Sequence, residues 1–256
     1  MPTALVTGAN GFIGSHLVRA LVDRGFAVRG LVRATSDLGG LAGVPVALHV
    51  GDLRDEASLL APAAGVDHVF HLGAVLMGTR REEFLATNAE GTAHLVRATL
   101  AGSPGVQRFV LVSSQAAAGP SDGRRPAQET DPPAPVSWYG ESKARAEAIV
   151  REQAGRLPVT IVRPSSVYGE RERDIAQMFG PVWCRLQPRL GLRSRRAVAV
   201  YVGDLVEGIV AAALSPASVG RTYFLNHPEV LTPAQVTAGA ARAMGRRAGV
   251  PVPVPS

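Results

Sequence analysis

Short apolar runs alternate with amphipathic segments along the first two thirds of the chain. The runs are rich in β-branched residues and lie at 3–7, 27–32, 46–50, 68–72, 108–113 and 159–163. Segments with helical periodicity lie between them, at 12–24, 55–61, 81–101 and 137–154. Near-continuous apolar strands separated by helices are typical of a parallel sheet covered on both faces. The pattern therefore predicts an α/β fold with a doubly wound parallel sheet.

Beyond residue 164 this alternation weakens. A helix at about 174–187, a strand at 197–201, a helix at 204–214, a strand at 222–226 and a helix at 233–247 predict a smaller cap. We expect the cap to span 165–250, interleaved with the sheet domain of 1–164. The proline-rich tail at 251–256 cannot continue a helix and is expected to fray. The loop at 118–137 is long and rich in Pro, Gly and Asp, and such loops tend to be functional.

Composition is that of an ordinary globular protein. The 256 residues are 46% apolar and 19% charged, and they can bury one core with a small cap. The single cysteine, Cys184, excludes an internal disulfide. The start of the chain lacks the basic region and long apolar segment of a signal peptide, and no run reaches the roughly 18 apolar residues that span a bilayer. We therefore expect a cytoplasmic location and no membrane partner.

The net charge of +6 raises the question of nucleic acid. Most arginines are scattered, and the dense group is Arg185, Arg189, Arg193, Arg195 and Arg196. A solvated loop and helix face is the first interpretation of this group, and an anion-binding edge near a phosphorylated substrate is the second. Nucleic acid is not expected as a partner.

A glycine-rich turn follows the first predicted strand. In "TGANGFIG", Gly8, Gly11 and Gly14 are spaced three apart before the helix at 12–24. A tight turn needs glycine's freedom in φ, and a pyrophosphate approaches the backbone only where no Cβ intervenes. The helix N-terminus adds free N–H groups and partial positive charge. The turn therefore predicts a dinucleotide site, with a purely structural turn as the alternative.

The end of the second strand should select the cofactor. NAD sites have an acid there that accepts from the adenosine ribose, whereas this strand ends in Val32 and Arg33. A guanidinium suits the 2′-phosphate of NADP, so NADP is favoured; Arg33 as an ordinary surface residue is the alternative. In "GDLRD", Asp52 is either an acceptor for the adenine amino group or a helix N-cap.

One position in the chain keeps a lysine. Of the 27 basic residues, Lys143 is the only one that is not arginine. Tyr139 lies four residues earlier, so both side chains project from one face of the predicted helix. A phenol with a pKa near 10 is a poor proton carrier at neutral pH, and a nearby ammonium lowers that pKa. The planar fork of arginine cannot replace a compact ammonium, so the pair predicts acid–base chemistry.

Two serines, Ser113 and Ser114, follow the fifth strand. A hydroxyl at the carboxyl edge of a parallel sheet lies where such folds bind ligands, so one of them could hold a substrate oxygen beside Tyr139. Adjacent serines are also ordinary turn residues.

Seven motifs stand in a characteristic order: "TGANGFIG", "GDLRD", "HLGA", "TNAEGT", "VSSQAAAG", "YGESK" and "RPSSVYG". In this order they resemble the extended short-chain dehydrogenase/reductases, the NAD(P)-dependent epimerase/dehydratase family. The resemblance is close over about 3–170 and looser at 201–214. It implies a Rossmann-type sheet, a Ser–Tyr–Lys catalytic set and hydride transfer at C4 of nicotinamide.

The resemblance also assigns individual residues. It implies catalytic roles for Ser114, Tyr139, Lys143 and Asn88, the last helping to fix the lysine and a water. Pro164 to Val167 match the segment that borders the nicotinamide. Together with the glycine turn and the residues at the strand ends, the resemblance implies the following cofactor-binding residues: Gly8, Asn10, Gly11, Phe12, Ile13, Gly14, Arg33, Asp52, Leu53, Leu72, Gly73, Ala74, Ser113, Tyr139, Lys143, Pro164, Ser166 and Val167. No metal site is expected.

Departures from the family pattern narrow the reaction. Gln115 and Ala116 stand where the sugar 4,6-dehydratases carry Asp-Glu, so dehydration is not expected. The cation at Arg33 resembles the pattern of the reductase branch of the family, such as the dihydroflavonol-reductase-like enzymes, rather than that of the NAD-retaining epimerases. The chain also ends earlier than is usual for the family, which puts closure of the substrate pocket in question.

These observations favour an oxidoreductase that moves hydride between NADP(H) and an alcohol or ketone carbon. A nucleotide-sugar epimerase with tightly held NAD is one alternative. A non-catalytic NADP(H)-sensing protein is another, although such relatives usually lose the Tyr–Lys pair. The expected partner is a small molecule, either an alcohol or ketone or a nucleotide sugar. Helix pairing in the family is compatible with a homodimer.

Overall fold

The computed structural model describes residues 1–121, 123, 125–172, 180, 186–190, 198–246 and 249–254. The chain forms two compact units, which are described separately. The first comprises Met1–Pro164 and Gly203–Leu225, and the second comprises Ser165–Val202 and Asn226–Ser256. Within the described ranges, no helix has the length and apolar character needed to cross a membrane.

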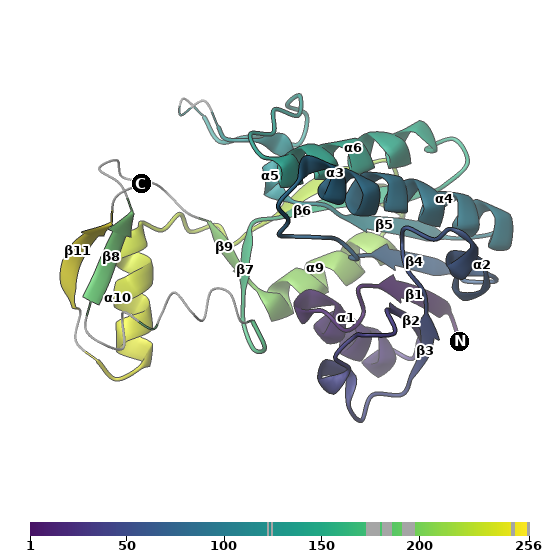
Figure 1. Cartoon of the computed structure of the whole chain (residues 1–256), viewed down its shortest axis with the longest axis horizontal. Coiled ribbons are helices and arrows are strands. Elements are labelled where there is room, and N and C mark those ends of the chain that lie inside the picture. The colour runs from purple at the N-terminus through teal and green to yellow at the C-terminus, as the bar shows by residue number, and fades with distance from the viewer. Residues whose placement is uncertain are drawn as a thin grey trace. The chain divides into compact units, whose positions relative to one another are not determined.

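A seven-stranded sheet forms the centre of the first unit (Figure 1). Its strands are β1 (Thr3–Thr7), β2 (Ala27–Val32), β3 (Val46–Val50), β4 (His68–His71), β5 (Arg108–Val112), β6 (Val159–Pro164) and β10 (Thr222–Leu225). They lie in the order β10-β6-β5-β4-β1-β2-β3, and all neighbours are parallel. The predicted doubly wound parallel sheet is confirmed. The segment 222–226 was expected in the cap, but β10 instead extends this sheet beside β6.

Helices cover both faces of the sheet. α1 (Phe12–Asp23) and α9 (Val202–Leu214) lie on one face, and α4 (Gly91–Gly102) and α6 (Trp138–Glu152) lie on the other (Figure 1). α2 (Ala57–Ala63) packs against α4. α3 (Arg81–Phe84) and the π-helical turn η2 (Leu85–Glu90) lead into α4, so the predicted helix at 81–101 is continuous but widened in the middle. The short elements are α5 (Gln115–Ala118), η1 (Gly39–Leu41) and η3 (Pro216–Ser218).

The apolar core lies between the sheet and the helices. Strand residues Leu5, Phe109 and Ile161 are buried and belong to one cluster with Leu95 of α4 and Val150 of α6. Burying a side chain of this size contributes about 2 kcal/mol relative to leaving it in water. The core therefore holds β1, β4, β5 and β6 firmly, and their carboxyl ends form one edge on which side chains can be positioned.

In its described residues, the second unit has two short parallel strand pairs. β7 (Ser166–Tyr168) pairs with β9 (Ala199–Tyr201), and β8 (Leu186–Leu190) pairs with β11 (Val250–Val254). α10 (Pro233–Ala243) starts with a capping box formed by Thr232 and Gln235. Residues 251–254 of the tail, which was expected to fray, belong to β11 and pair with β8. The predicted helix at 174–187 lies mostly outside the described residues, and its end at 186–187 belongs to β8.

Candidate active site

The glycine turn after β1 requires glycine at two positions. Gly8 has a φ of +67°, and a Cβ there would lie 2.9 Å from the backbone N of Gly73, just after β4. A Cβ on Gly14 would lie 2.0 Å from the Gly8 carbonyl oxygen. The Gly11 N–H closes the turn by donating to that carbonyl at 3.0 Å. The spacing thus lets α1 start directly against β1.

The N-terminus of α1 is suited to an anion. Gly11 is its exposed N-cap, and among the described residues no side chain caps the helix and no acid stands in its first turn. A Cβ on Gly11 would meet only the Gly8 carbonyl, at 3.2 Å. The first-turn N–H groups, including those of the predicted Phe12 and Ile13, are therefore available to a pyrophosphate. Asn10, also predicted, donates to the Asp37 carbonyl at 3.2 Å.

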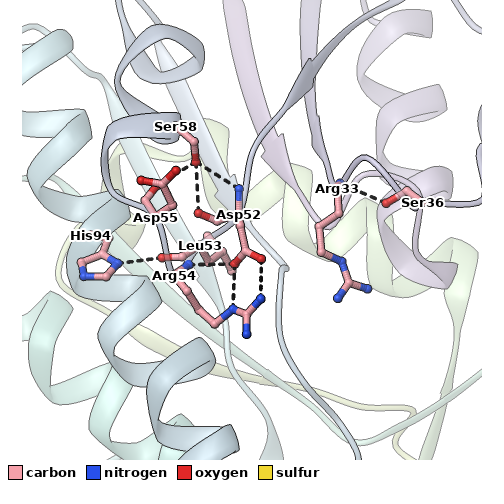
Figure 2. Close-up of polar contacts among 8 residues, drawn as sticks. All are labelled: Arg33, Ser36, Asp52, Leu53, Arg54, Asp55, Ser58 and His94. Carbon is pink, nitrogen blue, oxygen red and sulfur yellow. Dashed lines mark hydrogen bonds and ion pairs between the residues drawn. The ribbon is translucent and has the colours of Figure 1, made fainter.

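Arg33 and Asp52 follow β2 and β3, and Figure 2 shows them with their partners. The Asp52 carboxylate accepts from Arg54 Nε at 3.1 Å, from Nη2 at 2.8 Å and from the backbone N–H at 2.9 Å. These bonds hold the pKa of Asp52 at about 2, with a smaller contribution from the Arg33 charge. α2 begins at Ala57, so the N-cap alternative for Asp52 is wrong. Within the described part of the chain, no carboxylate pairs with Arg33.

The segment after β4 packs against the glycine turn and against the end of β3. A Cβ on Gly73 would lie 2.9 Å from Leu53 Cδ1, and Leu53 is buried. Leu72 and Ala74 flank Gly73 in the chain. The structure therefore brings Gly8, Leu53 and Gly73 together, as a shared cofactor site requires.

Tyr139 and Lys143 lie on one face of α6. Ser137 caps this helix, accepting from the Gly140 N–H at 3.0 Å, so the helix begins just before Tyr139. Lys143 is 3% exposed, and its Nζ donates to the Val112 carbonyl at the end of β5, at 2.8 Å. The pair therefore meets the carboxyl edge of the sheet.

The electrostatics of this pair differ from the expectation. Burial lowers the pKa of Lys143 to about 8, and the Glu147 carboxylate acts in the opposite direction. Burial raises the pKa of Tyr139 above its ordinary 10, and a hydrogen bond with Ser114 only partly offsets this. The expected lowering of the Tyr139 pKa is therefore not found, because the effect of burial dominates. At neutral pH Tyr139 is a protonated acid.

The two serines after β5 have different partners. Ser113 is buried, and its Oγ donates to Glu147 Oε1 at 2.6 Å. Glu147 also accepts from Arg163, at 2.9 Å from Nε and 2.7 Å from Nη2. Ser114 caps α5 through its Oγ and bonds with Tyr139. Ser114 is thus the serine beside the tyrosine, whereas Ser113 belongs to a buried ion-pair cluster.

Asn88 lies in η2 and joins α6 to the loop after β4. Its Nδ2 donates to the Val75 carbonyl at 3.0 Å and to Ser142 Oγ at 2.9 Å, while its Oδ1 accepts from the Val75 N–H at 2.7 Å. Ser142 Oγ in turn donates to the Tyr139 carbonyl at 2.7 Å. Asn88 therefore fixes the turn of α6 that lies between Tyr139 and Lys143.

A buried chain of polar contacts links the glycine turn to Asn88. His71 Nδ1 lies 2.7 Å from Thr7 Oγ1, and Nε2 lies 2.9 Å from Thr92 Oγ1. Thr7 Oγ1 also accepts from the Gly73 N–H at 3.0 Å, and Thr92 Oγ1 donates to the Asn88 carbonyl at 2.5 Å. Burial, assisted by the Lys143 charge, lowers the pKa of His71 to about 3. The imidazole is therefore neutral.

The residues expected to border the nicotinamide fall in both units. Pro164 ends β6 in the first unit, paired with Leu225 of β10. Ser166 and Val167 lie in β7 of the second unit.

Comparison with known proteins identifies the family. The NAD dependent epimerase/dehydratase family matches residues 4–225. The chain belongs to this family. Similar proteins include Sterol demethylase protein B of Methylococcus capsulatus, which is 37% identical over 65% of this chain and 52% of that protein. The 3-beta-hydroxysteroid dehydrogenase of Mycolicibacterium neoaurum is 31% identical over 95% of this chain and 70% of that protein. The chain thus spans about half the length of Sterol demethylase protein B.

A solved structure supports the same family assignment. The short-chain dehydrogenase/reductase superfamily protein from Agrobacterium tumefaciens, with bound NAD, has a TM-score of 0.83 and 28% identity, over 99% of this chain and 86% of that one. The expected family is therefore confirmed. The glycine turn and open α1 terminus described above fit such a dinucleotide.

Several residues of the site were not singled out from the sequence. They are His71, Thr92, Glu147 and Arg163. Three of them stand in quoted motifs, "HLGA", "TNAEGT" and "RPSSVYG", and Glu147 lies one turn after Lys143. The motifs therefore contain these residues, but only the tertiary structure shows which of their side chains form hydrogen bonds with one another.

Proposed function

We propose that this chain is an NADP(H)-dependent oxidoreductase that interconverts an alcohol and a ketone. The observation that carries the proposal is the meeting of Ser114, Tyr139 and Lys143 at the carboxyl edge of the sheet, the edge that also carries the glycine turn. A nicotinamide cofactor, when bound, would supply or accept a hydride at its C4.

The side chains divide the remaining chemistry. The hydroxyls of Ser114 and Tyr139 would hold the substrate oxygen between them. Because burial keeps Tyr139 protonated at neutral pH, it donates the proton that this oxygen needs during reduction. In the oxidative direction the Tyr139 phenolate takes the alcohol proton. Lys143 would donate to the nicotinamide ribose hydroxyls, while Ser113 stays bonded to Glu147.

Arg33 supports NADP as the cofactor. Among the described residues its guanidinium pairs with no carboxylate, whereas neighbouring Arg54 is paired with Asp52 (Figure 2). The guanidinium is thus available to grip a 2′-phosphate in a fork. We expect Arg33→Ala to weaken NADP binding about tenfold or more in titration calorimetry, and to leave NAD binding nearly unchanged. Tighter binding of NAD than of NADP by the unaltered protein would refute this choice.

The similarity to a hydroxysteroid dehydrogenase over 95% of the chain supports redox chemistry at an alcohol carbon. The family description also includes epimerases. An epimerase returns the hydride to the same substrate and releases no reduced cofactor. Stoichiometric release of NADPH with ketone formation therefore separates the two functions.

Tyr139→Phe tests the mechanism. The variant should lose turnover yet bind NADP within a few-fold of the unaltered protein, since only the proton carrier is removed. Tyr223→Phe, on β10, is a matched control that should keep its activity. Substantial turnover by Tyr139→Phe would contradict the proposed role.

A further inference from the structure

Four large apolar side chains stand exposed in two segments, one in the loop after β4 and one directly before Tyr139. Leu76 and Met77, after β4, are 62% and 80% exposed, and Val136 and Trp138, just before Tyr139, are 80% and 49% exposed. We call these four residues the apolar rim. Single exposed apolar residues are common, but several of them next to a reactive group indicate a ligand surface.

Hydrogen bonds hold the two halves of the apolar rim at the same place. The Asn88 side chain bridges the Val75 carbonyl, directly before Leu76, and Ser142 Oγ on α6. Ser142 Oγ reaches the Tyr139 carbonyl, directly after Trp138 in the chain. The loop after β4 is therefore fixed against the start of α6, and both segments belong to the unit that carries Tyr139.

The three arginines beside the apolar rim are each paired with a glutamate. Arg80 Nε donates to Glu83 Oε1 at 3.0 Å, and Arg81 pairs with Glu141 of α6. Arg145 also pairs with Glu141, at 3.0 Å. These arginines are thus committed to carboxylates and are not available to a diphosphate. The arginine group at 185–196 lies mostly outside the described residues.

We propose that the apolar rim binds the body of the substrate, an uncharged alcohol or ketone on a large apolar skeleton rather than a nucleotide sugar. This inference rests on the proposed function, because it takes Tyr139 as the group that meets the substrate oxygen. With the oxygen bonded to Tyr139 and Ser114, the hydrocarbon lies on Leu76, Met77 and Trp138. Affinity should then grow with apolar length, by about fourfold per buried methylene.

A series of 2-alkanols, from 2-butanol to 2-undecanol, tests the inference by binding alone. Trp183→Phe leaves Trp138 as the only tryptophan, so its fluorescence reports occupancy of the apolar rim without turnover. In that background, we expect the dissociation constant to fall about fourfold per methylene until the rim is covered. Leu76→Ser combined with Met77→Ser should bring that factor toward one. The matched control, Leu48→Ser with Val50→Ser, removes exposed apolar side chains from edge strand β3. It should leave the change of about fourfold in dissociation constant per methylene unaltered.

Each outcome decides between the two proposals. Dissociation constants independent of chain length, or tighter binding of UDP-glucose than of every alkanol, would overturn the apolar substrate. NADP reduction by short alkanols without length dependence overturns it as well, but leaves the oxidoreductase standing. Length-dependent binding with no NADP reduction supports the apolar rim and counts against the oxidoreductase. Circular dichroism of the double variants verifies that they are folded.

Discussion

His71 Nδ1 and Thr7 Oγ1 lie 2.7 Å apart in the core, and the partners on the other side of the ring decide which of the two donates. At the other side of the ring, Thr92 Oγ1 uses its hydrogen to donate to the Asn88 carbonyl, at 2.5 Å. Thr92 must therefore accept from His71 Nε2, at 2.9 Å. Since the neutral ring carries one hydrogen, Nδ1 accepts from Thr7. One directed chain thus runs from the glycine turn to the helix that holds Asn88.

The first prediction concerns this tautomer. His71 should remain neutral, with its hydrogen on Nε2, until the pH approaches 3, because burial disfavours the cation. Imidazole ¹⁵N chemical shifts followed with pH report both the tautomer and the titration. His71→Leu should cost about 3 kcal/mol of unfolding free energy, because it leaves two buried hydroxyls without this partner. Titration of His71 near the ordinary 6.5 would rule out the directed chain.

Lys143→Met should stabilise the fold while it abolishes turnover. The pKa of Lys143 is lowered from 10.5 to about 8, so the folded state binds the ammonium proton less tightly than the unfolded chain does. Below pH 8 this costs about 3 kcal/mol, and the bond to Val112 that the variant loses offsets about 1 kcal/mol. We expect a net gain of about 2 kcal/mol in urea unfolding at neutral pH, which turns into a loss of about 1 kcal/mol above the unfolded pKa of 10.5, where only the lost bond to Val112 counts.

The same linkage applies to the unaltered protein. Its stability contribution from Lys143 should rise between about pH 8 and 10.5, where the folded state has released the proton and the unfolded chain still holds it. An unfolding free energy for Lys143→Met that falls below that of the unaltered protein at neutral pH would show that the ammonium is better accommodated than its burial implies.

Glu147→Gln should unfold the protein at markedly lower temperature. Arg163 is 1% exposed and would lose its buried counter-ion, while Ser113 would lose a charged acceptor. Breaking a buried ion pair on one side costs about 3–5 kcal/mol. Glu56→Gln, which removes the partner of Arg97 at the surface, is the matched control and should leave the melting temperature nearly unchanged. Equal shifts for the two variants would contradict the structural role of Glu147.

Gly8→Ala should impair cofactor binding specifically. Gly8 and Gly25 both have positive φ, at +67° and +79°, so alanine strains the backbone at either position. A Cβ on Gly8 would also press on Gly73, whereas nothing lies within 4 Å at Gly25. Gly25→Ala should lose about 1 kcal/mol of stability and Gly8→Ala more, because of its contact with Gly73, but only Gly8→Ala should weaken NADP binding, by about tenfold or more. Equal affinities would show that the glycine turn does not bind the cofactor.

Reduction and oxidation should respond differently to pH. The pKa of Tyr139 is raised above 10, so the phenol required for reduction is present throughout the neutral range. Oxidation needs the phenolate, so its rate should still be rising at pH 10. Initial rates in both directions, at saturating cofactor, measure this. An oxidation rate that levels off well below pH 10 would mean that another group carries the proton.

The predicted positions of the strands, the glycine turn and the Tyr–Lys pair depend on local features. The apolar runs locate β1 to β6 because each run corresponds to one strand. The glycine turn can be predicted from the sequence because the positive φ at Gly8 is a local requirement that glycine meets. Tyr139 and Lys143 share a face because helical periodicity alone places residues four apart together. Strand β10 pairs with β6, but it could not be assigned to the main sheet in the same way, because the regular alternation of strands and helices weakens beyond residue 164.

By itself, the sequence determined the doubly wound fold, the dinucleotide turn and the residue types available for proton transfer. The tertiary structure alone decided how those groups are used. In the folded chain, Ser113 forms a hydrogen bond with Glu147, whereas Ser114 forms one with Tyr139. Asp52 pairs with Arg54, and burial raises the pKa of Tyr139. Periodicity and turn preference act over a few residues. Hydrogen-bond partners and desolvation depend instead on which distant segments the sheet brings together.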